Sequence, residues 1–306
     1  MTVNGDLNER RHNLTGKSEL ASHEGTLVEQ GKTGGAWSLY DGLIAQIPED
    51  VQVIDYALGV NWSFMEAECG AGVAYTLSGG AKGSNRLDFR GRSLKEVAAL
   101  AKSWHFEEAT LGIAALNAWY SRMENLAAMG AMFDEHCEKG SCAECSDEIR
   151  LAKGCQRSTD AFDYYRPQIE EFASKNGRPA KVVVVGHFPH VEDIAEYANL
   201  TVLERNCRDE WDTPDPACEY VIPDADYVFM TGVTLINKTM PRLLALSDNS
   251  TSAVVGPSAV PSPTLFEYGL NTIAGRCVVD PERAKFSAVT CQPFASSLCS
   301  FIINKA

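Results

Sequence analysis

Residues 181–189 read KVVVVGHFP, an apolar run that passes directly into small, polar and Pro-bearing residues. The same pattern recurs at residues 200–206, 227–234 and 253–258. Strands this apolar are buried on both faces, which is typical of a parallel sheet covered by helices on both sides. From residue 159 onward such strands alternate with helical segments, and this alternation predicts a doubly wound α/β sheet.

The turn after the first of these strands is a candidate binding site, because ligands of parallel sheets bind where strand carboxyl ends pass into loops. Residues 186–190 hold only one glycine where a dinucleotide-binding protein carries G-x-G-x-x-G, yet a helix start there would attract an anion. We expect His187 to be a metal ligand or an acid/base, with a helix-capping or packing histidine as the alternative. Glu204 ends the second strand, where it would orient a hydroxyl or coordinate metal; the alternative is a structural partner of Arg205.

The segment 231–239 holds hydroxyls, an amide and an ammonium after the third strand. It departs from the phosphate-loop spacing because Asn237 stands where the second glycine would be, so an ATPase is excluded. Such groups can still surround a carboxylate or phosphate, and ordinary strand-to-helix turns are the alternative. On this edge we expect ligand contacts from Gly186, Thr231, Gly232, Thr234, Asn237, Lys238, Thr239, Gly256, Pro257 and Ser258.

The first part of the chain has a different pattern. Residues 1–35 are a polar, Gly-rich tail. Three strand-like runs at 51–58, 61–67 and 71–77 are separated only by short turns, which predicts an antiparallel meander packed by helices. Together these segments predict an α+β domain over residues 36–125, with a helix over 106–137.

Three residues of this domain are candidate ligand contacts. Asn61 and Trp62 place an amide and an aromatic ring where a plain strand would be apolar. Asn117 is a lone amide in an apolar helix, so it either lines a cleft between the two domains or is a hydrogen-bonded core residue.

Residues 126–158 contain the end of a helix and a Cys-rich insert. The C-x4-C-x2-C part of its spacing matches plant-type iron–sulfur proteins, and C-x2-C equally suits zinc. Reduced thiols without a metal are the alternative. The candidate ligands are Cys137, Cys142, Cys145 and Cys155.

Composition limits the partners. With Lys+Arg 27 against Asp+Glu 41, the formal net charge is -14, which disfavours nucleic acid and anionic membranes as partners. No run approaches the roughly 18 apolar residues of a membrane span. The first residues lack the apolar stretch of a signal peptide, so we expect a cytoplasmic protein. The sequence leaves open whether the protein forms a homo-oligomer.

Several of these motifs occur together in one known family. They lie at residues 59–63, 114–118, 186–189, 203–205, 231–239 and 256–258. In this combination the chain resembles, over about residues 36–290, a bacterial and archaeal family described as putative heavy-metal chelation proteins. The resemblance implies an enolase-N-terminal-like domain at 36–125, a Rossmann-like domain at 159–306, and a site in the cleft between them. The Cys-rich insert departs from the family.

These observations predict a protein whose cleft binds a small anionic ligand or a metal complex, through heavy-metal chelation or metal-chelate metabolism. Whether it catalyses a reaction stays open. One alternative is an enzyme with a nucleotide-type cofactor, either a dinucleotide or S-adenosylmethionine, since the sheet could hold one. The other is a redox or cluster-bearing partner protein that uses the four clustered thiols.

Overall fold

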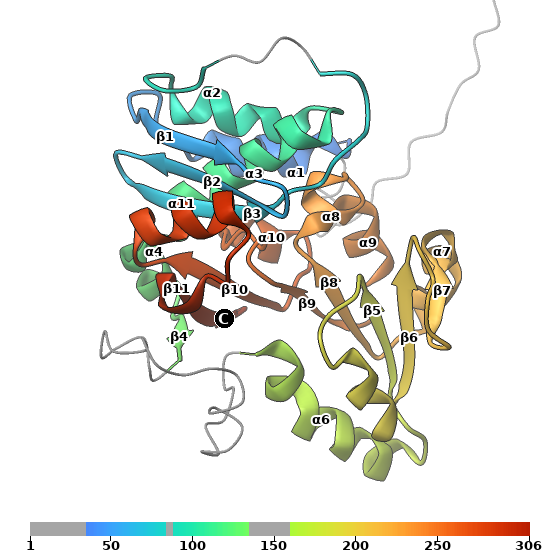
Figure 1. Cartoon of the computed structure of the whole chain (residues 1–306). Helices are drawn as coiled ribbons and strands as arrows, with labels where there is room; N and C mark the ends of the chain where they lie inside the picture. The colour runs from blue at the N-terminus through green and yellow to red at the C-terminus, as the bar shows by residue number, and fades with distance from the viewer. Residues whose placement is uncertain (1–34, 84–87, 135–159) are drawn as a thin grey trace, which may run out of the picture.

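The computed structural model describes residues 35–83, 88–134 and 160–306, and its elements are labelled in Figure 1. The polar tail up to residue 34 and the four clustered cysteines lie outside these ranges, so their predictions stay predictions. Among the helices of the described residues, none combines the length and apolar content that a membrane span requires.

The N-terminal part is a small antiparallel sheet packed by helices, as the meander prediction requires. Its strands, in the order β1-β2-β3, are β1 (Val53–Leu58), β2 (Trp62–Ala67) and β3 (Gly70–Tyr75). Its helices are α1 (Trp37–Ala45), α2 (Leu94–Ala98), the 3₁₀ helix η1 (Ala99–Lys102) and α3 (Phe106–Tyr120). Helix α3 lies so close to β3 that a Cβ on Gly72 would be 2.3 Å from the backbone nitrogen of Ala118.

The predicted helix over 106–137 is wrong in its extent. It ends at Tyr120, because Arg122 has an extended backbone (ψ 140°) and begins a new turn. A short helix α4 (Met123–Ala128) and a two-residue strand β4 (Met132–Phe133) follow.

The rest of the chain forms one large sheet of eight strands in the order β4-β11-β10-β9-β8-β5-β6-β7. The six strands β10-β9-β8-β5-β6-β7 pair with one another in parallel. At one edge, β11 pairs antiparallel with β10, and β4 pairs antiparallel with β11. The parallel sheet is therefore confirmed, with an antiparallel extension that the sequence pattern does not predict. The strands are β5 (Lys181–Val185), β6 (Asn199–Glu204), β7 (Asp212–Pro214), β8 (Tyr227–Thr231), β9 (Thr251–Val255), β10 (Thr272–Val278) and β11 (Leu298–Asn304).

The helices of this part connect successive strands. They are α6 (Ala161–Asn176), η2 (Val191–Glu196), η3 (Asp215–Ala217), α7 (Cys218–Val221), η4 (Ile222–Asp224), α8 (Val233–Ile236), α9 (Met240–Leu246), α10 (Pro263–Glu267), α11 (Pro281–Thr290) and η5 (Ala295–Ser297). Side chains cap two of these helices, because Ser262 accepts from the N–H of Thr264 and Asp280 accepts from the N–H of Arg283.

Both faces of the large sheet are buried, which explains its apolar strands. Along β5, Val182 and Val184 pack in the cluster that includes α6, whereas Val183 and Val185 pack in the cluster that includes the N-terminal part. Successive strand residues point to opposite faces, so this alternation is expected. Helix α6 and the N-terminal part lie on opposite sides of the sheet in Figure 1. The N-terminal part and the large sheet thus share one continuous core.

The strand order places the candidate site. From β5 the chain moves outward through β6 and β7, then returns to add β8 on the other side of β5. The reversal brings the carboxyl ends of β5 and β8 side by side. The helix start expected within residues 186–190 is instead that of the six-residue 3₁₀ helix η2, which begins at Val191 after His190 adopts a left-handed backbone (φ 61°).

Candidate functional site

Three turns at the carboxyl edge of the sheet lie against one another. A Cβ on Gly186 (φ 97°) would be 2.9 Å from Thr231 Cγ2, and one on Gly256 (φ 100°) would be 4.0 Å from the ring of Phe188. Gly232 packs still closer, because its Cβ would lie 2.3 Å from the carbonyl carbon of Ser258. Glycine is therefore required where these backbones meet.

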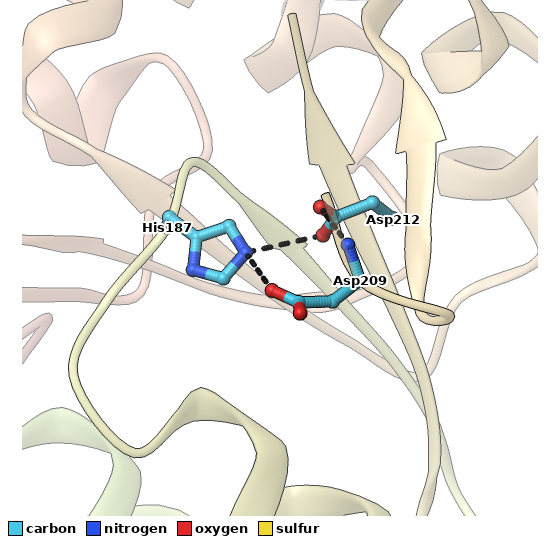
Figure 2. A group of neighbouring side chains, drawn as sticks. All are labelled: His187, Asp209 and Asp212. Carbon is cyan, nitrogen blue, oxygen red and sulfur yellow. Dashed lines mark hydrogen bonds and ion pairs between the residues drawn. The ribbon is translucent and has the colours of Figure 1, made fainter. Parts of the chain in front are cut away.

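His187 leaves this edge and meets two carboxylates (Figure 2). Its Nε2 lies 3.3 Å from Asp209 Oδ2 and 3.2 Å from Asp212 Oδ1. Both aspartates follow β6, and Asp212 is the first residue of β7, so the pairing of β7 with β6 positions them. We call His187, Asp209 and Asp212 the His187 cluster.

Backbone groups hold Asp212 in its charged form. Its side chain is 0% exposed, and its Oδ2 accepts from the backbone N–H groups of Arg208 (2.6 Å) and Asp209 (3.0 Å). Burial raises the pKa of Asp212, but these two hydrogen bonds and the neighbouring His187 outweigh burial and hold that pKa below its usual value. At neutral pH the Asp212 side chain is therefore a carboxylate.

The His187 cluster has donors that suit a cation. One imidazole nitrogen and two carboxylate oxygens all lie within 4.8 Å of one another. Zinc and other divalent transition metals take nitrogen and oxygen ligands of these types. Without a metal, His187 and Asp212 share a hydrogen bond, so the same geometry also fits a purely structural role.

Asp209 and Asp212 are not among the site residues predicted from the sequence. A signal was available, because Asp209-Glu210-Trp211-Asp212 is an acidic run in the loop that follows the second strand. A second group of possible ligands, His190, Glu192 and Asp193, lies in the first turn of η2 with all three side chains exposed.

Glu204 ends β6 as predicted, and its carboxylate caps its own turn. Oε1 accepts from the backbone N–H groups of Arg205 (2.7 Å) and Asn206 (3.4 Å). The guanidinium of Arg205 pairs instead with Asp215 at 2.9 Å, so a Glu204–Arg205 side-chain pair, the structural alternative for Glu204, is not formed.

The hydroxyls and the amide of segment 231–239 are engaged within their own turns. The buried Thr234 hydroxyl donates to the carbonyl of Thr231 (2.6 Å). Asn237 Oδ1 accepts from the N–H (3.1 Å) and the hydroxyl (2.7 Å) of Thr239. These contacts match the ordinary-turn alternative, in which side chains substitute for backbone hydrogen bonds.

Lys238 contacts the N-terminal part. Its ammonium donates to the carbonyls of Ser103 and Ile236, and it lies 5.8 Å from the ring centroid of Trp104 and 5.7 Å from that of Phe106. Burial lowers the pKa of Lys238 to about 8. Lys238 thus joins the segment between η1 and α3 to the turn that follows α8.

Asn117 and Ser258 join the two parts of the molecule. Asn117 Nδ2 donates to the carbonyls of Val73 (2.9 Å) and Pro257 (3.1 Å). Ser258 Oγ accepts from the backbone N–H of Tyr75 (2.8 Å). Asn117 and Ser258 therefore lie where the two parts of the molecule meet, and their hydrogen bonds to backbone groups fit a structural role.

Asn61 and Trp62 lie at the start of β2. Asn61 is exposed, and its carbonyl accepts from the N–H of Thr76 (2.9 Å). The Trp62 ring stands edge-on between Tyr75 (5.5 Å between centroids) and Phe294 (5.4 Å). Trp62 thus belongs to an aromatic row between β3 and the segment after α11.

The architecture defines the class of protein: mixed α/β, with a large, mostly parallel sheet, an accompanying antiparallel sheet, and polar side chains at the carboxyl edge. Two family models agree with this division, and both are described as putative heavy-metal chelation. DUF4213 matches residues 40–120, and DUF364 matches residues 171–290.

A solved structure shows the family. A DUF364 protein of unknown function from Desulfitobacterium hafniense DCB-2 is 30% identical, with a TM-score of 0.73 over 89% of this chain and 99% of that chain. The chain therefore belongs to the DUF364 family, and the resemblance noted from its motifs is confirmed.

Two further proteins are more distantly similar. A DUF364 protein of unknown function from Pyrococcus horikoshii shares the fold at 20% identity, with a TM-score of 0.64 over 87% of this chain and 98% of that chain. An uncharacterised protein of Methanocaldococcus jannaschii is 27% identical over 255 residues, which cover 79% of this chain and 85% of the relative.

Proposed function

We propose that this protein binds a divalent transition-metal ion, free or complexed with a small ligand, at the His187 cluster. The observation that carries the proposal is the approach of His187 Nε2 to Asp209 (3.3 Å) and Asp212 (3.2 Å) at the carboxyl edge of the sheet. The family description, heavy-metal chelation, supports the same class of ligand.

Electrostatics favours a cation over a phosphate-bearing ligand at this edge. The first turn of η2 carries Glu192 and Asp193, so the segment after β5 presents carboxylates where a phosphate would approach. Lys238 is the cation expected for an anionic group, and its ammonium is bound to two carbonyls. The formal net charge of -14 acts in the same direction.

The donor set also selects among metals. An imidazole and two carboxylates suit borderline ions such as Zn²⁺, Co²⁺ and Ni²⁺, whereas soft ions prefer thiolate. Cys207 lies in the same loop, but its Sγ is directed to the Glu204 carbonyl (3.7 Å) and it is not part of the cluster. A metal complex with a small organic ligand would leave the remaining coordination positions to that ligand.

Isothermal titration calorimetry of metal-stripped protein without an affinity tag tests the proposal. To remove competing thiols, the four clustered cysteines (137, 142, 145 and 155) are first changed to serine. We expect His187→Ala and Asp209→Asn each to weaken Zn²⁺ binding by about tenfold or more, since each removes a ligand. Asp215→Asn is the matched control, because Asp215 pairs with Arg205 outside the cluster.

Two results would contradict the proposal. One is the absence of Zn²⁺, Co²⁺ and Ni²⁺ binding to the serine background. The other is binding that His187→Ala and Asp209→Asn leave unchanged. If His190→Ala abolishes binding instead, the ligands are those of the exposed group in η2.

A nucleotide-type cofactor is the second candidate, and the strand order supports it. The order β7-β6-β5-β8-β9-β10 corresponds to the 3-2-1-4-5-6 order of dinucleotide-binding folds, so residues 160–306 are proposed as a Rossmann-like unit. Glu204 then ends the second strand, where an acid contacts the ribose in such folds. Calorimetry with NAD, NADP and S-adenosylmethionine decides, and no heat with any of them removes this candidate.

A further inference from the structure

A pocket of about 490 Å³ lies where the end of α3, helix α4 and the connection between β9 and α10 meet. Its volume falls in the range of small-molecule sites, roughly 300–1,000 Å³. The His187 cluster does not line it, and neither do the residues expected from the sequence to bind a ligand. It is therefore independent of the proposed metal site.

The most buried members of its lining offer an apolar surface. Tyr120 is 5% exposed, and its hydroxyl donates to the carbonyl of Leu43 (2.7 Å). Ser262 is 0% exposed, and its Oγ accepts from the N–H of Thr264 (3.3 Å). Since these polar groups already have partners, the Tyr120 ring and Pro261, which also lines the pocket, are suited to contact the apolar body of a ligand.

Arg122 supplies a positioned cation on the α3–α4 side. Its guanidinium lies 3.9 Å from the ring centroid of Trp119, and Nε donates to the Trp119 carbonyl (2.8 Å). Nη2 donates to Asn125 Oδ1 (3.3 Å). These neutral acceptors fix the plane of the guanidinium without neutralising it, and the Glu124 carboxylate at 3.4 Å is 70% exposed and screened by water.

The α10 side supplies the opposite charge. Glu267 ends α10 and lines the same pocket with an exposed carboxylate. A planar guanidinium matches a carboxylate through paired hydrogen bonds. A carboxylate such as Glu267 attracts an ammonium, and the acidity of the whole chain disfavours a ligand with negative charge alone.

We propose that this pocket binds a free α-amino acid with an apolar side chain. Its carboxylate contacts Arg122, its ammonium faces Glu267, and its side chain packs against Trp119, Tyr120 and Pro261. The two walls come from the N-terminal part and from the large sheet, so a bound amino acid bridges the two parts of the molecule.

Calorimetry with three probes of equal ring size separates the charges: L-phenylalanine, 3-phenylpropionate and phenethylamine. We expect L-phenylalanine to bind about tenfold or more tightly than either single-charge probe, as a charge-assisted hydrogen bond allows. Arg122→Lys keeps the positive charge but loses the planar guanidinium, so it should weaken the binding of L-phenylalanine and 3-phenylpropionate, which both carry a carboxylate. Glu267→Gln should weaken the binding of L-phenylalanine and phenethylamine, which both carry an ammonium.

Glu124→Gln is the matched control, because Glu124 pairs with Arg122 without lining the pocket, and it leaves all three affinities within about twofold. Circular dichroism verifies each fold, and the exposed Glu267 variant keeps the test decisive if Arg122→Lys does not fold. The proposal is overturned if L-phenylalanine does not bind at millimolar concentration. It is also overturned if phenethylamine binds as tightly, or if Glu267→Gln changes nothing.

Discussion

Replacing Lys238 by methionine removes an ammonium that the fold buries, and we expect this to change how stability depends on pH. The ammonium lies between two parts of the molecule, bound to the carbonyls of Ser103 and Ile236 and placed over Trp104 and Phe106. Methionine keeps the apolar length of the side chain and removes the charge.

The sign follows from the protons bound by each state. Burial lowers the pKa of Lys238 to about 8, against 10.5 for the ordinary side chain. Between these two values the unfolded chain binds more protons than the folded one, so the free energy of unfolding rises with pH. Below pH 8 the folded protein carries the full cost of the buried charge.

The magnitude comes from the same two values. Their difference, 10.5 minus about 8, is about 2.5 pH units, which corresponds to roughly 3.4 kcal/mol at most. Lys238 is only half-buried, and water screens part of this effect. The carbonyls and aromatic rings also favour the ammonium. We therefore expect about 1–2 kcal/mol.

Urea unfolding at about pH 7 and about pH 9.5, followed by circular dichroism, measures this effect. The unfolding free energy of wild type, relative to Lys238→Met, should rise by about 1–2 kcal/mol between the two pH values. Lys175→Met is the control, since Lys175 is 65% exposed and pairs with Glu171 on the surface. A fall in the relative stability of wild type would refute the reasoning, because the carbonyl and ring contacts would then outweigh burial.

Two further predictions concern close contacts of strand β3. Gly72→Ala should destabilise the protein by about 1–3 kcal/mol or more in thermal or urea unfolding, because its Cβ would lie 2.3 Å from the backbone nitrogen of Ala118; Gly35→Ala, with open space around its Cβ, should have little effect. Ser258→Ala leaves the N–H of Tyr75 without its acceptor and should cost about 1–3 kcal/mol. Unchanged stability of Gly72→Ala would mean that β3 and α3 can move apart at little cost, and unchanged stability of Ser258→Ala would mean that the two parts of the molecule adjust at their interface.

Much of the fold could be read from patterns along the chain. Residues 182–185, for example, are four consecutive valines, as expected of a strand buried on both faces of a sheet. The antiparallel extension was not predictable in the same way. Strand β11 joins β10 only because the chain reverses through α11, and β4 is two residues long.

The sequence predicted the location of the candidate site better than the residues that form it. The sequence identified the carboxyl edge, including His187 and the glycines at 186 and 256, because these residues directly follow strands. It assigned Lys238 to an anionic ligand, whereas the ammonium contacts Ser103, which is 135 positions away in the chain. Such contacts depend on how distant segments pack, and no local pattern encodes them.

The sequence by itself determined the parallel sheet, the meander and the family, because apolar periodicity and turn residues act over short stretches of chain. Only the tertiary structure decided which charges meet. His187 and Asp212 are 25 positions apart and become neighbours because β7 pairs with β6 beside β5. Metal chemistry depends on distances of a few ångströms between side chains, and those distances are set by strand pairing.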